Sequence, residues 1–245
     1  MAVANFAIIL EDWCTSRLAG EGKETLMMPN KVDETIKECR FCRIASSSGA
    51  SSNSLVDRVL LENEEFFAIC SIGGFIPGWT LIFSKKHLPN LSAYYQSQIF
   101  LDFVEEVKLL LTEQYGDCIV FEHGALDNSA TACGVNHAHL HIVPFNQKIE
   151  FLARDYDLNL EWHTIDRYSI DQTFNEREYL FCSDNFNSKE FSGIVTILDT
   201  SISQFFRKVL AQAAGVVEFY DYKRFSFLET SERTYRTLHK MLDFA

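Results

Sequence analysis

NHAHLHIVPF, residues 136–145, is the most informative stretch of this chain. Successive side chains of a β-strand point to opposite faces, so a strand here would place His137, His139 and His141 on one face. The apolar residues between them would fill the other face. Histidine titrates near neutrality and can act as nucleophile, acid, base or ligand. The alternation therefore predicts a strand with a chemically active face. The competing interpretation is a solvated, histidine-rich strand edge or an adventitious metal site.

The surrounding residues predict an antiparallel sheet with one long helix. Short strands are expected at 57–61, 65–70, 79–84, 118–122 and 138–144. Residues 97–115 carry apolar side chains at three- and four-residue steps, as an amphipathic helix does, and Gly116 follows at the position of a C-terminal cap. This order is typical of an α+β fold.

The chain divides into an N-terminal segment (1–37), a central domain (38–148) and a C-terminal extension (149–245). The extension is expected to be α/β, with a strand at 193–198 and helices at 200–214 and 231–242. Arg207 and Lys208 are interpreted as the polar side of the first of these helices. The aromatic residues of 219–227 are interpreted as core or dimer packing.

The bulk composition limits the class of protein. A net charge of −12 disfavours binding to a nucleic acid polymer, because that function usually needs a basic face. No apolar run is long enough to span a membrane, and no secretory signal is visible. Seven cysteines, an odd count, fit reduced thiols better than a disulfide framework. We therefore expect a cytoplasmic protein that acts on a small phosphate ester.

Cys39 and Cys42 form a second motif, Cys-x-x-Cys, whose meaning is ambiguous. It could be a redox pair, half of a zinc site or two buried thiols. No thioredoxin-like strand and helix surround it, which weakens the redox interpretation. A tetrahedral zinc site needs two more ligands, and His87 and His137 are the candidates.

The pattern of His137, His139 and His141, each followed by an apolar residue, resembles the signature of the histidine-triad (HIT) family of nucleotide hydrolases and nucleotidyl transferases. The resemblance covers about residues 38–148. It implies that His139 is the nucleophile that forms a nucleotidyl-histidine, and that His141 and His137 support it as catalytic residues. A third histidine, rather than glutamine, goes mostly with hydrolases in that family. The resemblance therefore favours hydrolysis of a phosphoanhydride or phosphoramidate of a small nucleotide.

Two other functions remain open. One is a nucleotidyl transferase or phosphorylase resembling galactose-1-phosphate uridylyltransferase, whose signature has glutamine in the third place. The other is a non-catalytic nucleotide-binding module in which the extension is the interaction surface.

The cysteine pair extends the resemblance to the zinc-bearing subset of the family. There, such a pair shares one structural Zn²⁺ with two histidines, which correspond here to His87 and His137. The metal would be held by Cys39, Cys42, His87 and His137. Because all four ligands come from the protein, no position would remain for water.

This sequence departs from the family pattern at two places. Gly134 stands where many members have a serine that serves the leaving group, and Trp79 stands where many have histidine. The residues that could bind substrate in place of that serine are Asn128, Ser129, Thr131, Asn136 and His123. The base and ribose contacts of the family correspond to residues 70–72. Family members often pair through their sheets, so a homodimer is possible, or the extension could replace the second subunit.

Overall fold

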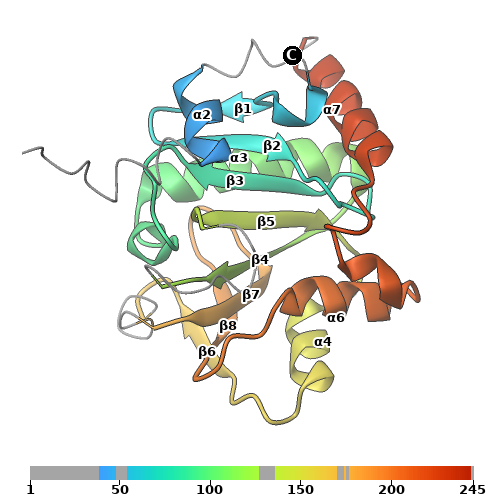
Figure 1. Ribbon diagram of the computed structural model, residues 1–245. Coiled ribbons are helices and arrows are strands. Elements are labelled where there is room, and N and C mark those ends of the chain that lie inside the picture. Colours follow the sequence, from blue (N-terminus) through green and yellow to red (C-terminus); the bar gives the residue numbers. More distant parts are fainter. Residues whose placement is uncertain (1–38, 48–53, 127–135, 170–173, 175–176, 244–245) are drawn as a thin grey trace, which may run out of the picture.

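One antiparallel sheet runs through the whole described chain (Figure 1). The computed structural model describes residues 39–47, 54–126, 136–169, 174 and 177–243. The sheet has eight strands in the order β1-β2-β3-β5-β4-β7-β8-β6, and every neighbouring pair is antiparallel. The α+β class expected from the sequence is confirmed.

The central domain supplies the first five strands: β1 (Leu61–Glu62), β2 (Phe66–Cys70), β3 (Thr80–Ser84), β4 (Cys118–Gly124) and β5 (His139–Pro144). The extension supplies β6 (His163–Asp166), β7 (Tyr179–Asn185) and β8 (Ser192–Ile197). These three strands do not form a sheet of their own, because β7 pairs with β4. Both edges of β4 are therefore paired within the chain, and a second copy cannot extend the sheet there.

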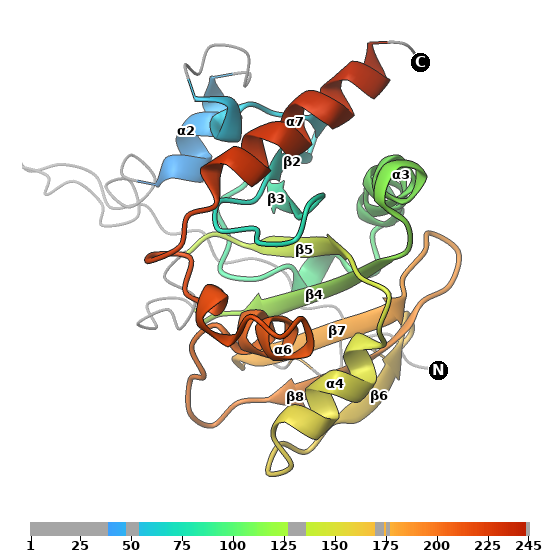
Figure 2. The same cartoon turned by 90° about the vertical axis from the view of Figure 1, so that its right-hand side faces the viewer.

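The sheet has helices on both faces (Figures 1 and 2). Helices α2 (Arg40–Ser46), α4 (Ile149–Tyr156) and α6 (Phe205–Ala213) contribute to the apolar cluster on one face. Helix α3 (Gln98–Tyr115) lies across the other face, and α7 (Leu228–Leu242) packs against it and against β2. Three short 3-10 turns complete the described elements: η1 (Leu55–Asp57), η2 (Ser92–Tyr94) and η3 (Val217–Tyr220). None of the described helices is long and apolar enough to cross a lipid bilayer.

Helix α3 confirms the helix that the apolar periodicity of the central domain predicted. Its apolar stripe, which includes Phe100, Val104 and Val107, is fully buried against the sheet. The helix ends at Gly116, whose φ of 88° suits glycine because it has no Cβ. Leu140 and Ile142 of β5 are buried in the same cluster, as the alternation predicted.

A buried carboxylate joins the central domain to the extension. Glu122 of β4 accepts hydrogen bonds at 2.6 Å from the hydroxyl groups of Tyr95 and Tyr179, and one at 2.7 Å from the Leu91 amide. Burial raises the pKa of Glu122 to about 7, although the three donors act in the opposite direction. Since Tyr179 belongs to β7, this network ties the two halves of the sheet together.

Two expected elements are corrected by the structure. Residues 57–61 do not form a strand: the 3-10 turn η1 occupies 55–57, where Asp57 accepts a hydrogen bond from Arg40, and β1 starts only at Leu61. The helix expected at 200–214 begins later, at Phe205, because Gln204 has a left-handed backbone conformation (φ 56°). The sequence did not predict α4, β6 or β7.

Candidate active site and metal centre

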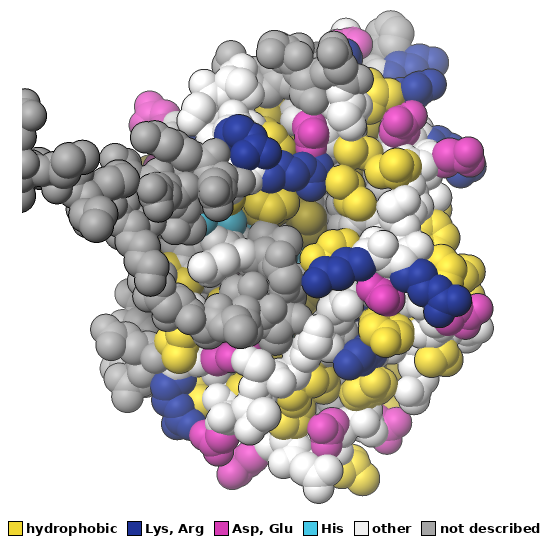
Figure 3. All heavy atoms as spheres, in the orientation of Figure 1, with side chains coloured by type: hydrophobic (Ala, Val, Ile, Leu, Met, Phe, Trp, Pro, Cys, Tyr) yellow, Lys and Arg dark blue, Asp and Glu magenta, His cyan; other side chains and the backbone are white. Residues whose placement is uncertain are grey.

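The triad strand lies in the middle of the sheet with its histidines on the face of α2, α4 and α6. In register, His139 lies opposite Phe83 and His141 opposite Leu81 on β3. His139 and His141 are half-buried and line a pocket on this face, whereas Leu140 and Ile142 are fully buried on the other. Figure 3 views this face and shows histidine atoms at its surface beside hydrophobic side chains. The expected geometry of the strand is therefore present.

His139 has its tautomer set by the backbone. Its Nδ1 lies 2.8 Å from the carbonyl oxygen of His137, and a carbonyl can only accept a hydrogen bond. Nδ1 must therefore carry the proton, which leaves the lone pair on Nε2. The ring stacks on Phe83, with centroids 5.1 Å apart, so its orientation is also fixed. Burial lowers the pKa of His139 to about 4, which keeps the imidazole neutral at physiological pH.

His141 has the opposite tautomer. The indole Nε1–H of Trp79 donates to its Nδ1 at 2.9 Å, and an indole N–H can only donate. Nδ1 is therefore the acceptor, and Nε2 carries the proton. The ring stacks on Phe121 with centroids 4.4 Å apart. Burial, helped by the charges of His139 and Arg207, holds the pKa of His141 well below its ordinary value. Trp79, a departure from the family pattern, thus makes His141 a neutral hydrogen-bond donor.

His123 is the third imidazole of the pocket and has a carboxylate as its partner. It lies on β4, and its Nε2 is 2.6 Å from Oε1 of Glu178, the residue that precedes β7. Ser201 donates a hydrogen bond to the other oxygen of Glu178. The hydrogen bond with His123 lowers the pKa of Glu178 below its ordinary value despite burial.

The pocket walls come from both parts of the chain. Its described lining residues from the central domain are Arg40, Phe41, Ile69, Cys70, Ser71, Ile72, Leu81, Phe121, His123, His139 and His141. Those from the extension are Gln204, Phe205, Phe206, Arg207 and Tyr222. Residues 70–72, which the resemblance associates with base and ribose, do line it. Of the predicted substrate-binding residues, His123 lines the pocket, whereas Asn136 is not among the lining residues; Asn128, Ser129 and Thr131 lie outside the described residues, as does Gly134.

Arg207 departs from the prediction that it lies on the polar side of an amphipathic helix. It is only 6% exposed. Its guanidinium group donates to the carbonyl oxygens of Gly73 and Tyr220 and lies 4.7 Å from the centre of a Trp79 ring. The run Phe205-Phe206 before it was the available signal, because two adjacent buried aromatic residues leave little room for a solvated neighbour.

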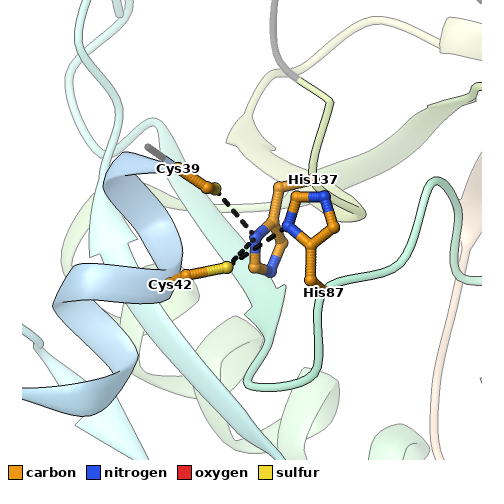
Figure 4. Close-up of side chains that lie close together, drawn as sticks. All are labelled: Cys39, Cys42, His87 and His137. Atoms are coloured by element: carbon orange, nitrogen blue, oxygen red, sulfur yellow. Dashed lines mark hydrogen bonds between the residues drawn. The ribbon is translucent and has the colours of Figure 1, made fainter. Parts of the chain in front are cut away.

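The cysteine pair and two histidines meet beside the pocket (Figure 4). Cys39 and Cys42 lie at the start of α2, His87 follows β3, and His137 precedes β5. One ligand atom from each residue lies within 4.8 Å of all the others. The Nδ1 atom of His137 is 3.4 Å from Sγ of Cys39 and 3.6 Å from Sγ of Cys42, and Nδ1 of His87 is 3.2 Å from Sγ of Cys42.

The orientation of His137 suits a ligand. Its Nε2 is 2.7 Å from the carbonyl oxygen of Ser84, so Nε2 donates the hydrogen bond and Nδ1 keeps its lone pair toward the thiols. Two sulfur and two nitrogen donors that converge in this way could hold one metal ion. His137 thus lies on the same face as His139 but belongs to the metal cluster; it is not among the lining residues of the pocket.

Comparison with known proteins finds a similarity in this region. The sequence model of the HIT domain matches residues 53–148, which contain the triad strand and His87. No curated protein matches the chain. Cys39, Cys42 and the whole extension lie outside the matched residues.

Three solved structures are partly similar to the chain. A hypothetical histidine triad nucleotide-binding protein from Sulfolobus tokodaii is 24% identical, with a TM-score of 0.33; the similarity covers 43% of this chain and 68% of that one. A Streptococcus mutans protein is 20% identical over 54% of this chain and 85% of that one, with a TM-score of 0.36. A Hit-like protein involved in cell-cycle regulation from Bartonella henselae is 20% identical over 47% and 79%, with a TM-score of 0.31. The residues that match the family model of the HIT domain, 53–148, include the histidines of the pocket.

Proposed function

We propose that this protein hydrolyses a phosphoanhydride or phosphoramidate of a small nucleotide through a nucleotidyl-histidine intermediate on His139. The observation that carries the proposal is the 2.8 Å hydrogen bond from Nδ1 of His139 to the carbonyl oxygen of His137. It gives a neutral imidazole with its lone pair on Nε2, in a ring that lines the pocket. A histidine nucleophile needs this combination, since a protonated ring cannot attack phosphorus.

The reaction would take place in two displacement steps. Nε2 of His139 forms a bond to the α-phosphorus while the bond from phosphorus to the leaving oxygen or nitrogen breaks. Water then attacks the phosphorus, the bond between nitrogen and phosphorus breaks, and a mononucleotide is released. The Nε2–H of His141 would donate to a phosphate oxygen and stabilise the negative charge of each transition state.

The pocket has the chemical character that a mononucleotide requires. Phe41, Ile69 and Leu81 form an apolar wall for a base, as is usual in small-molecule pockets. Arg207 brings positive charge to the same pocket, where a phosphate could be held. A long nucleic acid is not needed to explain this arrangement, and the overall acidity of the chain disfavours one.

The metal cluster fits a structural zinc ion. With Zn–S bonds of about 2.3 Å and Zn–N bonds of about 2.1 Å, tetrahedral geometry separates sulfur and nitrogen ligands by about 3.6 Å. The three measured separations between sulfur and nitrogen atoms are 3.2, 3.4 and 3.6 Å. When bound, zinc would supply no reaction chemistry but would hold His137 in place. The carbonyl group of His137 is the acceptor for His139, so a fixed His137 aims the nucleophile.

Covalent labelling tests the proposed function. The protein is incubated with nucleotides labelled at the α-phosphate, quenched in base to protect the acid-labile bond between phosphorus and nitrogen, and mapped by mass spectrometry. We expect a nucleotidyl group on His139, none in His139→Ala, and normal labelling in His163→Ala, whose histidine is exposed on β6. Turnover without any adduct on His139 would contradict the mechanism.

The same assay separates the two alternative functions. With an acceptor phosphate added, a hydrolase still releases free mononucleotide, whereas a transferase or phosphorylase yields the nucleotidylated acceptor. A non-catalytic module would bind nucleotide without labelling or turnover, and His139→Ala would leave that binding intact.

A further inference from the structure

The three imidazoles of the pocket differ in the group that each one faces. His139 faces a backbone carbonyl, His141 faces an indole N–H, and His123 faces a carboxylate. The first partner leaves a lone pair for attack, and the second leaves an N–H for a phosphate oxygen. A carboxylate does something else: its negative charge favours the protonated imidazolium. The third partner therefore suits His123 to donate a proton.

The His123–Glu178 pair is held across the junction between the central domain and the extension. Strands β4 and β7 pair with His123 opposite Leu180 and Gly124 opposite Tyr179, and Glu178 comes directly before β7. The two side chains are only 7% and 10% exposed. Ser201 donates to the second oxygen of Glu178, so the carboxylate is fixed on both sides.

Several charged and titratable groups of the described residues lie around His123. Glu178 contributes its carboxylate from the start of β7, and the buried Glu122 is the neighbouring residue on β4. On β5, His139 and His141 line the same pocket as His123. Burial is the main cause that lowers the pKa values of both, and the charge of His123 adds a smaller contribution. Arg207 of α6 lines the same pocket. Glu178 is the carboxylate that is hydrogen-bonded to the ring of His123.

We propose that His123 is the general acid that protonates the leaving group, and that Glu178 is the positioning residue that keeps the imidazole charged and oriented. This inference rests on the proposed function and adds to it the way in which poor leaving groups depart. As His139 attacks, the imidazolium of His123 transfers a ring N–H proton to the leaving oxygen or nitrogen, and the electron pair of the breaking bond goes to that atom. In the second step, neutral His123 takes a proton from the attacking water and returns to its starting state.

If His123 is a general acid, the substrates should have leaving groups that require a proton. Such leaving groups are amines or alkoxides, released from a nucleoside 5′-phosphate. Such groups depart slowly as anions, so general acid catalysis matters most for them. A phenolate that carries a nitro group departs without a proton. The loss of rate in a His123 variant should therefore depend on the leaving group if His123 is a general acid. It should not depend on the leaving group if His123 only shapes the pocket.

The experiment compares two substrates of one nucleoside, the 5′-phosphoramidate and the 5′-(4-nitrophenyl phosphate), in wild type and His123→Gln. Glutamine keeps an amide donor for Glu178 but cannot transfer a proton. We expect the rate constant for adduct formation on His139, measured in a single turnover, to fall by roughly 100-fold or more with the phosphoramidate and by less than about threefold with the nitrophenyl ester. The second step, in which His123 acts as a base, is shared by both substrates and does not enter this rate constant. His163→Gln, on exposed β6, serves as the control for loss of a histidine and should keep both rates.

Glu178→Gln provides a second, independent readout. Without the carboxylate the imidazolium loses its proton more readily, so the high-pH decline in the rate of adduct formation with the phosphoramidate should move to lower pH. An unchanged pH profile, or an equal loss in the rate of adduct formation with both substrates in His123→Gln, would overturn the acid role while leaving the His139 adduct intact. If wild type forms no adduct on His139 with either substrate, the proposed function fails and the acid role fails with it.

Discussion

Residues 53–148 and residues 149–243 share one sheet, yet they give the pocket different kinds of group. The HIT domain supplies the imidazoles, which sit on adjacent strands β4 and β5. The extension supplies what surrounds them, including the Glu178 carboxylate and the Arg207 guanidinium. The reactive groups are thus concentrated in a short motif, whereas the groups that set their charge and limit access come from distant segments. Changes in the two regions should therefore have different effects.

Loss of the metal cluster should have the largest effect. Helix α2 spans seven residues, too few to be stable alone, and it holds Phe41 against Phe83 with ring centroids 4.0 Å apart. We expect Cys42→Ala to lose bound zinc and several kcal/mol of stability, which corresponds to a fall in Tm of roughly 10 °C. Metal analysis and calorimetry measure both quantities. Cys118→Ala, which removes a buried thiol outside the cluster, should keep one zinc per chain; retention of zinc in Cys42→Ala would refute the site.

Arg207→Met tests how strongly the extension supports the pocket. The substitution leaves the carbonyl oxygens of Gly73 and Tyr220 without their donor, so we expect the free energy of unfolding to fall by about 2 kcal/mol. Removal of the charge should also raise KM about tenfold. Denaturant unfolding and steady-state kinetics are the measurements. Lys208→Met changes a neighbouring, less buried cation and should alter neither the free energy of unfolding nor KM. Equal KM values for the two variants would show that Arg207 does not bind substrate.

Trp79→Phe tests the tautomer of His141. Without the indole donor, Nδ1 of His141 is no longer required to be an acceptor, and the ring can place its proton on the wrong nitrogen. We expect kcat to fall about tenfold with KM little changed. Nitrogen NMR of the imidazoles reports the tautomer directly. The matched control is Trp162→Phe, a buried indole whose N–H has no partner among the described residues; if both variants lose the same activity, the hydrogen bond is not the cause.

The pH dependence of stability should show the smallest effect. In the folded protein the pKa of Glu178 is lowered, chiefly by the hydrogen bond with His123, so this carboxylate contributes stability above its ordinary pKa of about 4.5. That contribution is lost as the pH falls below this value. Denaturant unfolding at pH 7 and pH 4 should therefore give a smaller drop for Glu178→Gln than for wild type. Glu232→Gln on α7 is the surface control, and an identical drop in all three proteins would contradict the coupling.

The sequence was informative where a pattern is local. The amphipathic period of 97–115 predicted α3, and the alternation of 138–144 predicted β5 and the face that its histidines share. The four metal-cluster residues were also identified, since a cysteine pair is visible in the sequence and the resemblance to a family supplied its partners. The extension was predicted less well, because β7 is placed by its pairing with β4, and such a long-range contact leaves no local pattern in the sequence.

The residues that could react can be read from the order of amino acids alone, because histidines at alternate positions share a face of any strand, whatever surrounds it. The role of each imidazole depends instead on the folded sheet. A carbonyl, an indole and a carboxylate fix the protons of His139, His141 and His123, and these partners lie 2, 62 and 55 residues away along the chain. A ring nitrogen is a donor or an acceptor according to its hydrogen-bond partner. For His141 and His123, that partner comes close only after the sheet has formed.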